Sequence, residues 1–206
     1  MSVASSRIDS KAEHSPLVRG ALSVARQAHA GQVRQTGCEE VPFIEHLLAV
    51  GELLAEYGYG DEVLAAGLLH DVIEHTELRS DPLHDRFGPE VAGLVEALSE
   101  DEEIPDYEER KEEHRDRVGE AGEGARAIFA ADKTANVIAL REAYAVRGEL
   151  VDEELPVGLD VKILVWEFDL EMLFRHTPEA PLVERFADEM VGLWGQRAEG
   201  GRASVC

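Results

Sequence analysis

The chain has 206 residues, of which 44% are hydrophobic, and this is enough apolar content for one domain with a substantial core. Its formal net charge of −23 at pH 7 disfavours non-specific binding to nucleic acid or to an anionic membrane surface. No apolar stretch reaches the roughly 18 residues of a membrane span, and the first residues lack a signal-peptide pattern. The two cysteines, Cys38 and Cys206, offer no disulfide framework. We therefore expect a cytoplasmic protein that binds neither nucleic acid nor membrane, with its oligomeric state left open.

Helical periodicity runs through most of the sequence. Residues 1–15 are polar and rich in serine, so we expect a flexible N-terminus. Apolar residues then recur at spacings of three and four, which predicts a helix from Pro16 to about residue 28. A loop over residues 33–40 leads to a second helix that ends near Gly58, and Asp61 is a suitable N-cap for a third.

The second half continues the helical pattern. We expect helices over residues 80–87, 89–98, 125–147, 161–176 and 182–197. Residues 99–123 form the most acidic tract, which is typical of a solvated loop and helix. No segment shows a period of two, so the sequence predicts an all-α fold in one domain over residues 16–198, followed by a flexible tail over residues 199–206.

The sequence LLHDVIEH at residues 68–75 places a His-Asp pair at the end of an apolar helical run. An imidazole nitrogen and a carboxylate oxygen are both acceptable ligands for Mn, Fe or Zn. On a continuous helix, His70 and Glu74 would share one face, as would Asp71 and His75. A lone His-Asp pair is more often a solvated helix end, so further members of a site must come from elsewhere in the chain.

His46 and Asp132 are two further titratable residues on apolar helices. Taken alone, His46 reads as a core histidine, and Asp132 as a helix residue paired with Lys133 or Arg141. Taken with the His-Asp pair, they supply two imidazoles and two carboxylates. That set can hold a divalent metal and leave coordination positions for water and substrate.

Six motifs occur in order between residues 21 and 140. They are AHAGQxR at 28–34, PFIxH at 42–46, AAGLLHDVxE at 65–74, FGxEV at 87–91, ERK at 109–111 and ADKxxN at 131–136. Together they resemble the HD-domain phosphohydrolases, and within them the hydrolase domain of the RelA/SpoT type and its small stand-alone relatives. The resemblance implies an HD-domain helical bundle with a core over residues 21–140 and additional C-terminal helices over residues 141–198.

The resemblance also implies roles for particular residues. The positions that match the four metal ligands are His46, His70, Asp71 and Asp132. Mn²⁺ is the usual ion, and Fe, Zn, Co and Mg are the alternatives. The positions that match the water-handling group are Glu74, which positions or activates the attacking water, and Asn136, which helps to hold it. The positions that match the substrate-binding residues are Arg34, near the base, and Arg110, Lys111 and Lys133, near the phosphates.

The implied substrate is a phosphorylated nucleotide, the guanosine alarmone with a 3′-pyrophosphate. It would be hydrolysed by a water that the metal activates, with release of pyrophosphate and GDP or GTP. The sequence leaves no room for the synthetase and regulatory domains of long relatives, so the implied form is a stand-alone hydrolase.

Three positions depart from the family pattern. His75 stands where the family commonly has Asp, Gln35 where it has a basic residue, and Leu47 where it has Pro. His75 could act as the general base, because its unperturbed pKa is about 6.5, or bind a second metal, or face solvent. The departures keep two alternatives open: an HD phosphohydrolase for a different nucleotide or phosphomonoester, and a non-catalytic nucleotide-binding HD protein. The second alternative ranks last, since all four matching ligands are present. Away from this site, we expect His114 at the surface.

Overall fold

A computed structural model of the chain describes residues 6–36, 39–155 and 157–198. Its elements in order are α1 (Arg7–His14), α2 (Pro16–Ala28), β1 (Val33–Thr36), β2 (Glu39–Pro42), α3 (Ile44–Glu56), α4 (Asp61–Leu69), α5 (Val72–His75), α6 (Ser80–Leu98), α7 (Tyr107–Glu120), α8 (Glu123–Arg147), the 3₁₀ helix η1 (Gly148–Glu154), α9 (Leu159–His176) and α10 (Pro181–Ala198). The fold is helical, as predicted, with one small two-stranded sheet. Within the described residues, no helix is long and apolar enough to cross a membrane.

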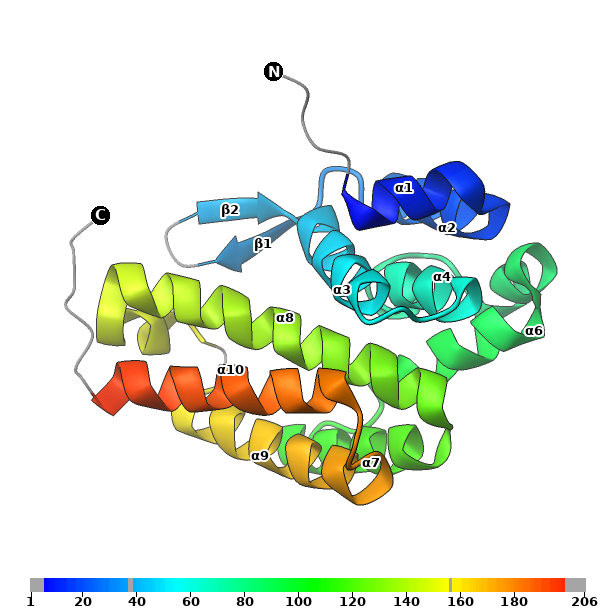
Figure 1. The fold of residues 1–206 in the computed structure, drawn as a ribbon. Helices are drawn as coiled ribbons and strands as arrows, with labels where there is room; N and C mark the ends of the chain where they lie inside the picture. The colour runs from blue at the N-terminus through cyan, green and yellow to red at the C-terminus, as the bar shows by residue number, and fades with distance from the viewer. Residues whose placement is uncertain (1–5, 37–38, 156, 199–206) are drawn as a thin grey trace.

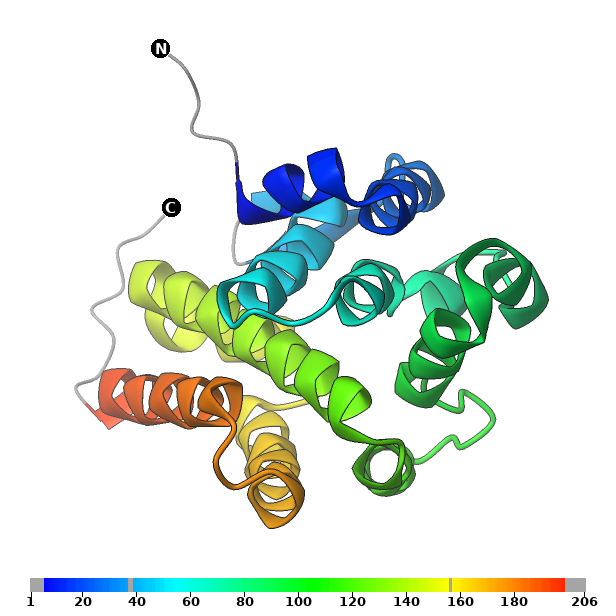
Figure 2. The same ribbon diagram turned by 45° about the vertical axis from the view of Figure 1, so that its right-hand side comes forward.

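The long helix α8 runs through the middle of the molecule (Figures 1 and 2). α10 packs along one side of α8, and α3, α4 and α6 contact it from other directions. The buried face of α8 is rich in small residues, among them Ala127, Ala130, Ala131 and Ala135. Small side chains let neighbouring helices pack closely, so the ends of α3 and α4 can bring polar groups against the middle of α8.

A glycine fixes how closely α4 approaches α3. A Cβ atom at Gly67 would overlap the side chain of Leu54 on α3. Interiors packed at this density leave little room for an added carbon, so a larger residue here would force the side chain of Leu54 to move. The same residue offers its carbonyl oxygen to His70, so the packing of the helices also fixes the orientation of a predicted metal ligand.

The expectation of a flexible segment over residues 1–15 is wrong for α1. Ser6 caps this helix by accepting from the backbone N–H of Asp9, and Ile8 is buried in the core at 1% exposure. The carboxylate of Glu52 on α3 accepts from the first backbone N–H groups of the helix, including that of Ile8 at 2.9 Å. The stabilising partners are more than 40 residues away in sequence, so the local polar composition misleads. Residues 1–5 and the expected tail over residues 199–206 lie outside the described part.

The loop expected over residues 33–40 is also wrong in part. β1 and β2 pair as an antiparallel hairpin, with Val33 opposite Pro42 and Arg34 opposite Val41. Four-residue strands are too short to show a clear period of two, so periodicity could not find them. The hairpin matters for the predicted site because β1 carries Arg34, one of the predicted substrate-binding residues.

The surface position expected for His114 is wrong as well. His114 lies on α7 with 4% exposure, and its ring packs edge-on against Phe129 with centroids 5.4 Å apart. Burial lowers the pKa of His114 to about 3, and the nearby positive charge of Lys133 acts in the same direction.

The buried neutral histidine predicts a pH-dependent stability. The unfolded chain protonates His114 near pH 6.5, whereas the folded chain resists protonation until about pH 3. The stability that this neutral ring contributes is therefore complete above pH 6.5 and is lost as the pH falls, by up to about 1.4 kcal/mol per pH unit. We expect His114→Gln to flatten this dependence in urea unfolding measured at several pH values between 5 and 7. The exposed His84→Gln is the matched control, and an unchanged slope in His114→Gln would contradict the assignment.

Candidate metal centre

His70 is oriented by the end of α4. The helix stops at Leu69 and α5 begins at Val72, so the continuous helix expected through His70 and Glu74 is broken at the His-Asp pair. The Nδ1 atom of His70 donates to the carbonyl oxygen of Gly67 at 2.8 Å, since a carbonyl can only accept. In the neutral ring, Nε2 then carries the lone pair. This buried Nε2 makes no hydrogen bond within the described residues.

The free nitrogen of His70 faces carboxylate oxygens. Nε2 lies 3.2 Å from Oδ1 of Asp71 and 3.8 Å from Oδ1 of Asp132. A lone pair and carboxylate oxygens repel each other unless a cation lies between them. A histidine that donates one ring N–H to a backbone carbonyl and presents the other nitrogen to carboxylates is the usual arrangement of a metal ligand.

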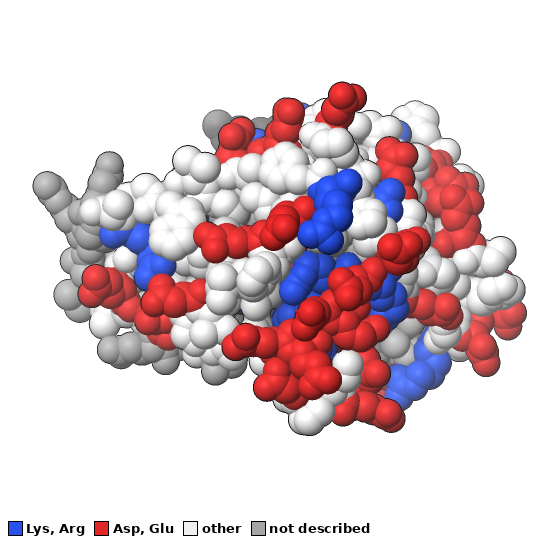
Figure 3. Space-filling view, turned by 90° about the horizontal axis from the view of Figure 1, so that it is seen from below, with Lys and Arg blue, Asp and Glu red and all other residues white. Residues whose placement is uncertain are grey.

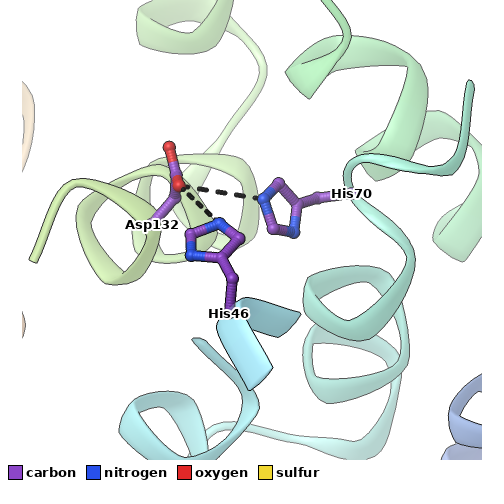
Figure 4. Close-up of side chains that lie close together, drawn as sticks. All are labelled: His46, His70 and Asp132. Atoms are coloured by element: carbon purple, nitrogen blue, oxygen red, sulfur yellow. Dashed lines mark ion pairs between the residues drawn. The ribbon is translucent and has the colours of Figure 1, made fainter. Parts of the chain in front are cut away.

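His46 completes the group from the first turn of α3. Its Nε2 lies 3.1 Å from Oδ1 of Asp132 and 3.8 Å from Oδ2 of Asp71. Figure 4 shows His46, His70 and Asp132 pointing toward one another from three separate helical segments. Their ligand atoms lie within 4.8 Å of one another. The structure thus brings together the four residues predicted as metal ligands.

Burial and charge prepare these groups for a cation. Burial lowers the pKa of His46, which favours the neutral ring that a metal requires. Burial alone would raise the pKa of Asp132, but the adjacent ammonium of Lys133 holds it well below its usual range. Lys133 Nζ donates to Oδ2 of Asp132 at 2.8 Å, and this leaves Oδ1 directed at the two imidazoles. The residues present therefore fit a divalent metal of mixed nitrogen and oxygen preference.

The predicted water-handling residues border the same place. Glu74 accepts from the backbone N–H of Glu100 at 2.8 Å, and burial raises the pKa of its carboxyl group. Asn136 lies one turn after Asp132 on α8 and donates from Nδ2 to Oδ1 of Asp132 at 2.7 Å. The side-chain oxygen of Asn136 accepts from Arg34 at 2.8 Å, so Arg34 and Asn136 are linked.

His75 lies beside Glu74 on α5. Its ring packs edge-on against Phe43 with centroids 5.2 Å apart, and its backbone oxygen accepts from Gln32 at 2.9 Å. Asp71, Glu74 and His75 each place one donor atom within 4.8 Å of the others. His75 is exposed, so all three expectations for it, a proton-accepting role, a second metal and a solvent-facing ring, are compatible with this position.

A polar cavity of about 370 Å³ is lined by three of the predicted metal ligands, His46, Asp71 and Asp132, and by the predicted water-handling residues Glu74 and Asn136. Arg34, Lys111 and Lys133 line it, as expected of substrate-binding residues. Arg110 does not line it: its guanidinium donates to Glu100 at 3.1 Å and to the carbonyl oxygen of Ile104 at 2.8 Å. Figure 3 shows basic side chains bordered by acidic ones on one face, so local positive charge exists within an acidic chain.

Four lining residues come from α9, namely Lys162, Val165, Trp166 and Asp169, and none of them was predicted from the sequence as a site residue. Lys162, Trp166 and Asp169 face the cavity with spacings of four and three, which places them on one side of the helix. Burial lowers the pKa of Lys162 to about 8, and its ammonium lies 5.1 Å from the centre of the Trp166 ring. Burial raises the pKa of Asp169 to about 6. The helical spacing was a usable signal, but no motif pointed to it.

A second cavity of about 550 Å³ adjoins the polar one. The two share Arg34, His46, Asn136 and Lys162 in their walls. The remaining lining is largely apolar, from β2, α3, α8 and η1, and includes Val41, Leu53, Leu140, Val151 and Leu155. A long ligand with one anionic end and one flat, less polar end would fit such a pair.

Comparison with known proteins places this site in a family. The family model described as HD domain matches residues 21–143. The chain is 34% identical over 117 residues, 57% of its length, to the guanosine-3′,5′-bis(diphosphate) 3′-pyrophosphohydrolase of Aquifex aeolicus (strain VF5), and the match covers 16% of that protein. It is 42% identical over 95 residues, 46% of its length, to the bifunctional (p)ppGpp synthase/hydrolase SpoT of Escherichia coli (strain K12), and the match covers 13% of that protein. The chain thus spans only a small part of the length of these curated relatives.

Solved structures share the fold. The crystal structure of lmo0812 from Listeria monocytogenes EGD-e aligns with a TM-score of 0.67 and 27% identity, over 73% of this chain and 99% of that one. A metazoan ortholog of SpoT that hydrolyzes ppGpp aligns with a TM-score of 0.68 and 21% identity, over 96% and 98% of the two chains. The second likeness shows the fold alone. Since the family model covers more than half of the residues and the matched segment contains all four converging ligands, the chain belongs to the HD-domain family.

Proposed function

We propose that the protein is a metal-dependent pyrophosphohydrolase that removes the 3′-pyrophosphate from a guanosine nucleotide. One observation supports the proposal most directly: His46, His70, Asp71 and Asp132 converge, and three of them, His46, Asp71 and Asp132, lie in the wall of a cavity that basic side chains also line. The names of the Aquifex aeolicus and Escherichia coli relatives support the substrate class.

The four converging residues would hold the metal, and we propose Mn²⁺, with Fe, Zn, Co and Mg as alternatives. The bound ion would polarise a phosphoryl oxygen and lower the pKa of a water. Glu74 borders this position with its carboxylate held by the N–H of Glu100, so it would orient the attacking water and take its proton. Asn136, fixed between Asp132 and Arg34, would hold the same water by its amide.

Positive charge in the cavity matches a polyphosphate. Lys111, Lys133 and Lys162 come from α7, α8 and α9, so they surround the cavity from three elements. Cationic donors placed around phosphoryl oxygens bind a polyphosphate through charge-assisted hydrogen bonds. Arg34 and Lys162 border both cavities, so they would contact the nucleotide where its phosphates join the nucleoside, and the apolar cavity would receive the base.

His75 favours a second candidate, an HD phosphohydrolase for another phosphorylated nucleotide. Its imidazole lines the polar cavity where the family pattern has a carboxylate. An imidazole changes the charge and the proton affinity beside Glu74. Because the departure falls on the reacting side of the cavity, it bears on which phosphate group is cleaved.

A substrate panel separates the two candidates. Purified protein loaded with Mn²⁺ is incubated with 3′-pyrophosphorylated guanosines, with ordinary nucleoside mono-, di- and triphosphates and with a generic phosphomonoester. Pyrophosphate release confined to the 3′-pyrophosphorylated guanosines supports the first function. Orthophosphate release from ordinary nucleotides supports the second, and no turnover of any of these substrates would overturn both.

Lys162 provides a prediction about substrate affinity. We expect Lys162→Met to raise KM for the active substrate about ten- to a hundredfold with little change in kcat, because the lost charge-assisted contact binds ground state and transition state alike. Steady-state kinetics on Mn²⁺-loaded protein measure this. Arg175→Met, at an exposed position on the same helix, is the matched control. A fall in kcat with unchanged KM would place Lys162 in the chemical step instead.

A further inference from the structure

Glu100, at the end of α6, connects two parts of the site that no motif connects. Its backbone N–H donates to Glu74, the proposed water-handling carboxylate, at 2.8 Å. Its side chain lies in the wall of the polar cavity with only 14% exposure. Glu100 therefore contacts the proposed water-handling residue Glu74 through its main chain, and the proposed phosphate-binding residue Lys111 through its carboxylate.

Two donors from α7 converge on that carboxylate. Arg110 Nε donates to Oε2 at 3.1 Å and Lys111 Nζ donates to Oε1, while the ring of His114 lies nearby, with Nδ1 3.8 Å from Oε1. Burial alone would raise the pKa of Glu100, but the charge of Lys111 lowers it, so the group is ionised. A partly buried ion pair with several partners holds its members far more firmly than an exposed pair does.

The segment that carries Glu100 is fixed from the same helix. Arg117 of α7 donates to the carbonyl oxygens of Ser99 at 2.6 Å and of Glu96 at 3.0 Å. α7 therefore grips the end of α6 at the main chain as well as at the Glu100 side chain. The position of α7 therefore helps to determine the position of the Glu100 N–H group, which donates to Glu74.

This arrangement also explains why Arg110 is absent from the cavity wall. Its guanidinium donates to the carboxylate of Glu100 and to the carbonyl oxygen of Ile104, and these bonds direct it away from the cavity. Lys111 does reach the cavity, and it shares Glu100 with Arg110. Arg110 thus balances part of the negative charge of Glu100 and leaves Lys111 with net positive charge to offer to a phosphate.

We propose that Glu100 is a positioning residue that couples the phosphate-binding side of the cavity to Glu74: its carboxylate sets Lys111, and its backbone N–H sets Glu74. This deepens the proposed function and rests on it for the identity of the reaction. The coupling itself makes a separate claim, namely that removing the carboxylate disturbs phosphate binding through Lys111.

Binding of inorganic pyrophosphate tests the coupling without turnover. Isothermal titration calorimetry on Mn²⁺-loaded protein compares Glu100→Gln and Glu100→Ala with Glu103→Gln, an exposed position on the following turn. We expect Glu100→Ala to weaken pyrophosphate binding about tenfold, Glu100→Gln to weaken it less because the amide oxygen still accepts, and Glu103→Gln to bind as the wild type does. Unchanged or tighter pyrophosphate binding in Glu100→Ala would overturn the proposal. Tighter binding would mean that the Glu100 carboxylate competes with pyrophosphate for Lys111 instead of positioning it.

A double-mutant cycle with Lys111→Met gives the second readout. If Glu100 acts through Lys111, the two losses of pyrophosphate affinity are less than additive, because Lys111 is already misplaced when Glu100 is gone. Additive losses would overturn the coupling. Thermal melting confirms that the variants fold, and the near-isosteric Glu100→Gln carries the test if Glu100→Ala does not.

Turnover then separates this proposal from the proposed function. In active protein, Glu100→Ala lowers kcat and raises KM together, because Glu74 and Lys111 are both disturbed, whereas a merely structural role would lower only the yield of folded protein. If the wild type hydrolyses none of the panel substrates but Glu100→Ala still binds pyrophosphate more weakly, the proposed function fails and the coupling stands.

Discussion

Replacing His70 with alanine is expected to abolish divalent-metal binding and hydrolysis together. A main-chain hydrogen bond from Nδ1 to Gly67 orients the free nitrogen of His70, so this proposed ligand is held in place before any ion binds. Loss of an outer-shell partner alone typically costs about 10–100-fold in metal affinity, and loss of the ligand itself costs more. Metal content after dialysis, measured by inductively coupled plasma mass spectrometry, reports the first effect, and pyrophosphate release reports the second.

The control for this experiment is His84→Ala. His84 is exposed on α6 and lines neither cavity, so its removal should change neither metal content nor turnover. Without bound metal, the negative charges of Asp71 and Asp132 are no longer offset by a cation between them. A His70→Ala protein that keeps one equivalent of Mn²⁺ and full activity would refute the assignment of the metal centre.

The four converging residues could be predicted because each stands in a local motif on or beside an apolar helix. The sequence carries their identity in ADKxxN, PFIxH and the His-Asp pair, and the burial of α3, α4 and α8 brings the motifs together. The break between α4 and α5 could not be predicted, since the residues after His70 keep a helical pattern. The break turns out to favour the site, because it frees His70 to bond back to Gly67.

The residues that sequence reasoning missed share one property: their partners are remote. Glu100 is one of 43 acidic residues and stands in a tract that reads as solvated, so only its contacts with α7 distinguish it. Lys162 lies on a C-terminal helix outside the matched segment of the family. Ile8 is buried against helices that follow it by tens of residues. In each case the tertiary contact, rather than the local pattern, determines the role.

Replacing Glu74 with glutamine is expected to leave metal binding intact and to lower kcat by about 10²–10⁴, the usual contribution of a positioned acid or base. Glutamine keeps the shape and can still accept from the N–H of Glu100, but it cannot take a proton. The protonation of Glu74 also predicts that kcat falls as the pH is lowered. Burial raises the pKa of its carboxyl group, so the ionised form is lost as the pH falls, and the loss begins at a higher pH than for an exposed glutamate.

The dependence of kcat on pH tests the assignment of Glu74 as the base. The wild-type kcat should decline at acidic pH as Glu74 becomes protonated, and the residual kcat of Glu74→Gln should lack that acidic decline, or acidic limb. Glu77→Gln, exposed just after α5, removes the same charge close by and should retain both the rate and the limb. If Glu74→Gln kept the wild-type kcat, the proton would have to go to another group, and His75, which lines the same cavity, would be the next to replace. A Glu74→Gln protein that lost its metal would instead make Glu74 a ligand, with Asp71 and His75 as its neighbours in a second site.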